Sequence, residues 1–108
     1  MKKREKAVVI PFPSLPWVKV EMGGALGRVK RKVIGDGRSV RVLEVSPEWN
    51  EFDWCSKPHV GYVTSGRLHL EFLGAAPLDV GRGMGFWIPS GCPHKAGCKR
   101  TATVFIVD

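Results

Sequence analysis

Two short stretches of the sequence gather side chains that can bind a metal ion. The first reads DWCSKPHVGYVTSG and contains an acid, a thiol and an imidazole at Asp53, Cys55 and His59. The second reads GMGFWIPSGCPH and ends in an imidazole at His94. A thiolate and two imidazoles suit Zn²⁺ or Fe²⁺, and a carboxylate can complete the coordination shell. The two stretches therefore predict one metal site, provided that the fold brings them together.

The spacing of these residues indicates which side chains can face the same way. In a strand, residues two and four positions apart share a face, so His59 shares its face with Val63, and Asp53 shares its face with Cys55. If Val63 faces the core, His59 enters the interior near one mouth of the fold. His94 begins a third set of this kind, and a sheet closed on itself would bring the sets together.

Each of these residues also has an interpretation that needs no metal. Two interior imidazoles can hydrogen-bond to each other or to a bound ligand. Cys55 can be a small buried apolar residue, and Asp53 can cap a turn or stay in solvent. Cys92 and Cys98 flank His94, and packing thiols are their simplest interpretation. A Cys-x-His-x3-Cys zinc site that includes His94, or a disulfide between the two cysteines, is the alternative.

The elements that must position these residues are short strands. The clearest is Arg67–Phe72, in which apolar and polar residues alternate strictly. Further strands are expected at 7–10, 17–20, 28–34, 38–45, 59–63, 78–80, 85–88 and 101–107. An Asp-Gly pair at 36–37 predicts a β-hairpin. No long stretch keeps a helical period without Gly or Pro, so we expect an all-β antiparallel sandwich or barrel with little or no helix.

Length and composition limit the class of protein. With 108 residues, of which 44% are apolar, we expect a single domain over 1–108, with residues 1–6 as a frayed basic terminus. The sequence has no long uncharged apolar run that would span a membrane, and no cleavage site follows its basic start, so a cytoplasmic protein is expected. Three cysteines, an odd number, fit free thiols better than a disulfide framework.

The net charge of +7 arises entirely from the first 32 residues. Such an excess can meet phosphates or an acidic surface. A solvated tail and a charged strand face are the simpler interpretation. No aromatic residue interrupts the basic run at 28–32, as a base-stacking surface would require, so the sequence argues against a nucleic-acid partner.

The spacing within the two stretches resembles the two motifs of the cupin superfamily. The second motif, Gly-x5-Pro-x-Gly-x2-His-x3-Asn, is matched by Gly83, Pro89, Gly91 and His94, with Cys98 in place of the final Asn. The first motif, in its form His-x-His-x3-Glu-x6-Gly, aligns with Asp53, Cys55, His59 and Gly66. Only the glycine of the first motif is retained, so its ligand types are changed.

The resemblance implies a small antiparallel jelly-roll β-barrel that holds one divalent metal ion. Carried over by position, the four ligand places fall to Asp53, Cys55, His59 and His94. Because a thiol replaces a harder ligand, zinc or iron is the expected metal rather than manganese.

The family also implies two classes of function. Many cupins are metal-dependent oxygenases, isomerases or decarboxylases of small polar or anionic molecules, whereas others are non-catalytic modules that sense a ligand or a metal. Tyr62 is a candidate general base, and Trp54 is a candidate pocket wall. Cupins commonly dimerise through N-terminal strands, so we expect a homodimer formed through residues 7–20.

Overall fold

The structure is a computed structural model that describes residues 6–22, 25–35, 37–49, 51 and 53–108. Within these residues the chain forms one 3-10 turn and nine strands. Their bounds are η1 (Phe12–Ser14), β1 (Val18–Met22), β2 (Ala25–Ile34), β3 (Arg38–Val45), β4 (His59–Ser65), β5 (Arg67–Phe72), β6 (Ala75–Gly81), β7 (Gly85–Ile88), β8 (His94–Gly97) and β9 (Ala102–Val107). In this part of the chain, no helix is long and apolar enough to cross a membrane.

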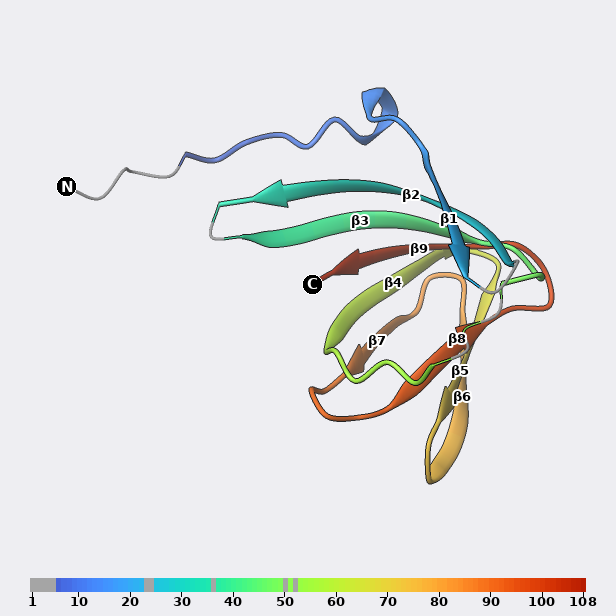
Figure 1. Cartoon of the computed structure of the whole chain (residues 1–108). Helices are drawn as coiled ribbons and strands as arrows, with labels where there is room; N and C mark the ends of the chain where they lie inside the picture. Colours follow the sequence, from blue (N-terminus) through green and yellow to red (C-terminus); the bar gives the residue numbers. More distant parts are fainter. Residues whose placement is uncertain (1–5, 23–24, 36, 50, 52) are drawn as a thin grey trace.

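The strands form two antiparallel sheets that face each other (Figure 1). The larger sheet has the order β1-β2-β3-β9-β4-β7, and the smaller has the order β6-β5-β8. The chain passes from the larger sheet to the smaller one between β4 and β5, at Gly66. This residue has a φ of +76°, and a Cβ atom there would lie 2.5 Å from the carbonyl oxygen of Thr101. Glycine is therefore required at this crossing.

Alternating side chains from both sheets form the core. Val45, Val63, Leu70, Ile88 and Val104 are completely or almost completely buried, and they come from β3, β4, β5, β7 and β9. Burying one such side chain contributes about 1.5–3 kcal/mol relative to leaving it in water. Apolar packing thus fixes the two sheets relative to each other, and with them the positions of the residues at the mouth between the sheets.

Most of the expected strands are confirmed. The hairpin at 36–37 joins β2 to β3, with Ile34 paired to Arg38 and a φ of +94° at Gly37. Asp36 itself lies outside the described residues. The alternation in β5 places Leu68 and Leu70 inside, and Arg67 and Glu71 outside.

Two of the expected strands are wrong. Residues 7–10 are not a strand, because no strand edge of the described chain pairs with them, and Val9 is 90% exposed. β6 begins at Ala75 rather than at residue 78, because Gly74, with a φ of +80°, completes the preceding turn. The expected all-β antiparallel fold, in contrast, is confirmed: the described strands form two sheets whose apolar inner faces pack together as a jelly-roll sandwich, without one continuous ring of strand hydrogen bonds.

Candidate metal centre

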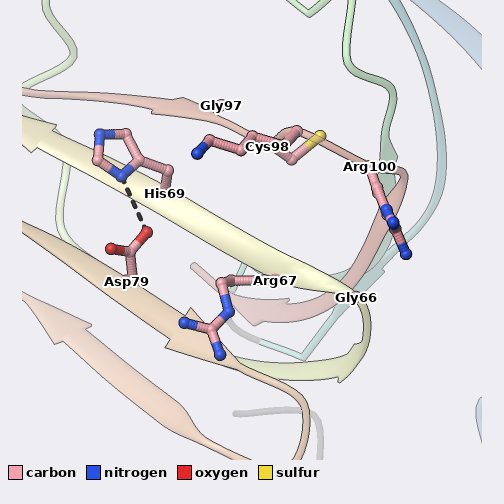
Figure 2. Close-up of a pocket in the computed structure, with 8 residues that line it drawn as sticks. Gly66, Arg67, His69, Asp79, Gly97, Cys98 and Arg100 are labelled. Atoms are coloured by element: carbon pink, nitrogen blue, oxygen red, sulfur yellow. Dashed lines mark hydrogen bonds and ion pairs between the residues drawn. The ribbon is translucent and has the colours of Figure 1, made fainter.

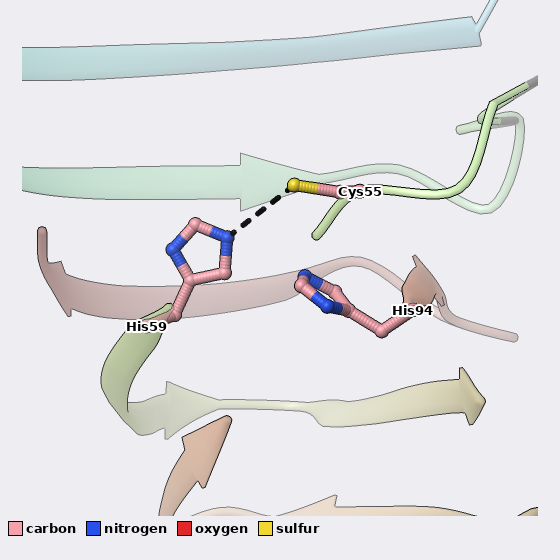
Figure 3. A group of neighbouring side chains, drawn as sticks. All are labelled: Cys55, His59 and His94. Carbon is pink, nitrogen blue, oxygen red and sulfur yellow. Dashed lines mark hydrogen bonds between the residues drawn. The ribbon is translucent and has the colours of Figure 1, made fainter. Parts of the chain in front are cut away.

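Cys55, His59 and His94 meet at the mouth between the two sheets (Figure 3). His59 is the first residue of β4, in the larger sheet, and His94 is the first residue of β8, in the smaller sheet. Cys55 lies in the connection before β4. An isolated bridge joins it to His94, since the amide of each residue donates to the carbonyl of the other at 2.9 Å. This bridge brings the thiol to the histidines without closure of a barrel.

The three side chains are close enough to share one ion. Their ligand atoms all lie within 4.8 Å of one another. The sulfur of Cys55 is 3.8 Å from Nε2 of His59. The two imidazole rings meet edge to face, with centroids 5.1 Å apart. His94 is 4% exposed, so the centre lies at the inner end of the mouth rather than on the surface.

Hydrogen bonds fix which ring nitrogen of each histidine is free. Nδ1 of His94 is 2.9 Å from the carbonyl oxygen of Cys92, and Nδ1 of His59 is 2.8 Å from Oδ1 of Asp108. Both partners are acceptors, so each Nδ1 carries the proton and donates. In the neutral imidazole Nε2 then holds a lone pair, as a metal ligand requires. Two imidazole nitrogens and one sulfur therefore present ligand electrons to the same space.

Asp108 is a residue of the candidate centre that the sequence motifs miss. It follows the last strand, and its backbone amide donates to the carbonyl of Ser39 at 2.9 Å. Arg41 donates from Nε to Oδ2 of Asp108 at 2.7 Å, and Ser39 donates to the same oxygen at 3.3 Å. The carboxylate thus holds the His59 ring from 49 positions away in the sequence. The pairing of β9 with both β3 and β4 positions it.

Burial and hydrogen bonding tune the charges of this pair. Burial lowers the pKa of His59, although the hydrogen bond to Asp108 partly opposes the shift. Burial alone would raise the pKa of Asp108, but the hydrogen bonds from Arg41 and His59 outweigh it and lower that pKa. Near neutral pH, His59 is therefore neutral and Asp108 is ionised, which is the state that favours metal binding at Nε2.

A cavity of about 310 Å³ adjoins the three side chains. Core residues of both sheets, including Leu70 and Ile88, form its apolar wall. Arg41 and Lys57 also line it, as do the acids Glu51 and Asp53, and Arg41 is paired with Asp108. Glu51 lies on this wall as well, but its carboxylate accepts the backbone amide of Ala96 at 2.8 Å.

The structure places the fourth expected ligand, Asp53, differently from the other three. Asp53 is exposed and lines the same cavity, but it lies outside the group formed by the thiol and the two imidazoles. Its role as a ligand stays a prediction. Gly61 lies beside His59 on the inner face, and the ring of Phe86 occupies the space that a side chain there would need.

The other cysteines remain outside the centre. All three cysteines are free, so no disulfide joins Cys92 to Cys98. The thiol of Cys98 donates to the carbonyl oxygen of Val45 at 3.3 Å, and burial raises its pKa. Cys98 is therefore protonated near neutral pH and is a packing residue, as the simplest interpretation predicted.

Two aromatic candidates do not reach the cavity wall. Tyr62 points to the outer face of β4, opposite to His59, and is 46% exposed, so its candidacy as general base is wrong. Trp54 is 38% exposed and packs under the ammonium group of Lys95, 4.7 Å from the ring centroid, rather than lining the cavity.

Comparison with known proteins identifies the fold. No family model and no curated protein matches the sequence. Solved structures do match. A cupin-2 domain protein from Shewanella frigidimarina has a TM-score of 0.60 and 23% identity, over 73% of this chain and 78% of that chain. The chain has the cupin fold.

Two other structures are similar to this chain at low sequence identity. The EutQ protein of Clostridium difficile has a TM-score of 0.72 and 16% identity, over 92% of this chain and 83% of that one. Fe(II)-HppE, solved with the alternative substrate (S)-1-HPP, has a TM-score of 0.72 and 14% identity. The match covers 94% of this chain but only 60% of HppE. At these identities the likeness concerns the fold.

Proposed function

We propose that this cupin binds one divalent metal ion, zinc or iron, through Cys55, His59 and His94. One observation carries the proposal. The ligand atoms of the three side chains lie within 4.8 Å of one another, and a hydrogen bond from Nδ1 of each histidine fixes the tautomer that metal binding requires. The donor set of one sulfur and two nitrogens suits both metals. The structural likeness to Fe(II)-HppE is compatible with iron.

The metal-binding proposal is tested by metal content and affinity. The protein is purified anaerobically without chelator, and elemental analysis should find about one zinc or iron per chain. Substitution of cobalt(II) should give a thiolate-to-cobalt charge-transfer band that Cys55→Ser removes. Cys92→Ser is the matched control, because Cys92 is a free thiol two residues from His94 but outside the group. Metal-free protein that fails to take up zinc, cobalt or iron would exclude the proposal.

We further propose that the centre acts on a small anionic molecule bound in the adjoining cavity. A bound metal would polarise an oxygen of that molecule as a Lewis acid. The chain itself would supply the rest: Lys57 would attract the anion, and the apolar wall would exclude bulk water. Reactions of the oxygenase, isomerase and decarboxylase types are consistent with such a site.

Asp53 is the carboxylate on this cavity that is available for a proton transfer or as a fourth ligand. Among the described residues it forms no hydrogen bond, whereas the carboxylate of Glu51 is engaged by a backbone amide. Asp53→Asn separates the two roles. Loss of metal with loss of turnover indicates a ligand, whereas loss of turnover with metal retained indicates an acid-base role.

The second candidate function is a non-catalytic module that binds a ligand or senses the metal. The engagement of Glu51 favours it, since this reduces the number of acid-base groups on the cavity. A panel of small carboxylic acids, assayed with the metal-loaded protein, distinguishes the two. Turnover supports an enzyme, and a rise in melting temperature without turnover supports the module.

A further inference from the structure

A second cavity, of about 560 Å³, lies on the outer face of the smaller sheet (Figure 2). It is separated from the metal centre by the strand β5. Side chains alternate along that strand. Leu68 and Leu70 face the cavity beside the metal centre, whereas Arg67 and His69 line the outer cavity. Its size falls within the range of pockets for small molecules. Nothing in the proposed metal chemistry uses this space.

Unpaired positive charge surrounds the cavity. Arg67 lies on β5, and Lys99 and Arg100 lie in the bend between β8 and β9. None of these three side chains forms a hydrogen bond or an ion pair with another described residue. Figure 2 shows Arg100 at the end of the cavity near Gly66 and His69 at the opposite end, with Arg67 between them along the strand. The three cations therefore line one cavity without a direct hydrogen bond to an acid among the described residues.

Asp79 is the one acid among the described residues that lines this cavity, and it is already engaged. Nδ1 of His69 donates to Oδ1 of Asp79 at 2.9 Å, across the paired strands β5 and β6. This hydrogen bond first, and then the charges of Arg67 and Lys99, lower the pKa of Asp79. Asp79 is thus ionised and holds the His69 ring against the cavity wall. Glu71 lies farther along β5, with Oε1 at 3.8 Å from Nε2 of His69, and does not line the cavity.

The floor of the cavity is open because a glycine forms it. Gly97 of β8 is paired with His69, and a Cβ atom built at Gly97 would meet no atom within 4 Å. Its φ is not positive, so other residues can adopt its backbone conformation. A side chain at this position would project into open space on the face of the sheet that the cavity occupies. The structure thus offers a way to fill the cavity without changing its charge.

We propose that this outer cavity binds the phosphate group of a small molecule. Two guanidinium groups supply paired N–H donors that match phosphate oxygens, and the ammonium group of Lys99 supplies a compact charge. The aliphatic stems and the glycine floor accommodate the less polar remainder of the molecule. Phosphate carries more charge than a single carboxylate, which suits three unpaired cations around one engaged acid.

The test uses pyrophosphate, inorganic phosphate and citrate as probes, with binding followed by calorimetry and by amide chemical shifts. Pyrophosphate should bind and should perturb the amides of Gly66, Gly97 and Lys99. Arg67→Gln should weaken its binding by about tenfold or more, as loss of one charge-assisted contact predicts. Arg82→Gln is the matched control: it removes the same charge from an exposed turn outside the cavity and should leave the affinity unchanged.

A second variant tests the cavity itself. Gly97→Val should abolish pyrophosphate binding while net charge and melting temperature remain close to those of the parent protein. Three results would overturn the proposal: equal weakening by Arg67→Gln and Arg82→Gln, unchanged binding by a folded Gly97→Val variant, or binding of citrate in preference to pyrophosphate. Binding of a single-stranded oligonucleotide without binding of pyrophosphate would also overturn it, in favour of a nucleic-acid surface.

The metal centre needs a separate control, because bound metals also attract phosphate. The titrations are therefore repeated with His94→Ala, which removes a metal ligand on the other side of β5. Unchanged pyrophosphate binding by this variant supports an outer site. Loss of binding places the anion at the metal and overturns the proposal, whatever the metal content of the parent protein shows.

Discussion

The protein contains two histidine–carboxylate pairs with nearly the same hydrogen-bond length and very different surroundings. Nδ1 of His59 is 2.8 Å from Asp108, and Nδ1 of His69 is 2.9 Å from Asp79. The side chains of the first pair are 13% and 28% exposed, whereas those of the second are 40% and 54% exposed. Only the first pair has a thiol and another imidazole beside its Nε2 atom. The comparison indicates that a fixed tautomer can serve a metal site only where the fold adds further donors.

The largest effect should come from removing an imidazole of the inner site. His94→Ala should reduce zinc affinity by more than about 100-fold, because the loss of a direct ligand exceeds the 10–100-fold typical of an outer partner. His69→Ala is the matched control and should leave zinc affinity unchanged. Competition with a chromophoric chelator measures both. Equal losses in the two variants would break the distinction between the pairs.

Neutralising the carboxylate that accepts the Nδ1 hydrogen bond of each histidine gives a second test of the difference between the pairs. Asp108→Asn should lower zinc affinity by about 10–100-fold, because the amide holds the ring less firmly and makes Nε2 less basic. Asp79→Asn should have no effect on zinc. If Asp108→Asn binds zinc as tightly as the parent protein does, then Asp108 serves only to anchor the chain end through Ser39 and Arg41.

The pH dependence should also separate the pairs. Burial lowers the pKa of His59 from 6.5. As the pH falls, the unfolded chain therefore binds a proton at His59 at a higher pH than the folded chain does. Its contribution to the free energy of unfolding is therefore present above pH 6.5 and is lost as the pH falls through the lower, folded pKa. Urea unfolding of the metal-free protein should show this loss. His59→Gln should remove it, whereas His69→Gln should retain it.

The smallest effect on either site should follow deletion of residues 1–10. Both pairs consist of residues after this segment, so zinc and pyrophosphate binding should persist. The oligomeric state should change, because Val8 and Val9 are 68% and 90% exposed in the single chain, and we expect them to bury this surface in a homodimer. Sedimentation should find a dimer for the full chain and a monomer for the deletion variant. A monomeric full chain would contradict the dimer.

The fold was largely predictable from the sequence because local signals and tertiary structure agree. Strict alternation in β5 and the Asp-Gly turn between β2 and β3 mark strands without reference to any distant residue. Residues 7–10 have the composition of a strand but no partner edge within the described chain. Pairing depends on such an edge, which local sequence does not contain.

The candidate site was predictable only where its residues lie in spaced motifs. His59 and His94 lie in register with the family pattern, and Cys55 shares the first motif. Asp108 has no motif, because its place beside His59 depends on β9 lying between β3 and β4. The outer cavity was not predictable from the sequence either. Arg67 lies far in the sequence from Lys99 and Arg100, and basic and acidic residues are equal in number after residue 32, so no local excess of charge marks the cavity.

The backbone bridge between Cys55 and His94 has a consequence for the rate of metal exchange. Two mutual amide–carbonyl hydrogen bonds hold these two ligand positions together whether or not an ion is bound. Folding therefore assembles most of the chelate in advance, and an arriving ion need not order a loose loop. Equally, a departing ion leaves the ligands in place for recapture. The centre should behave as a preformed chelator with fast loading and slow net loss, rather than as a loop that closes on its metal.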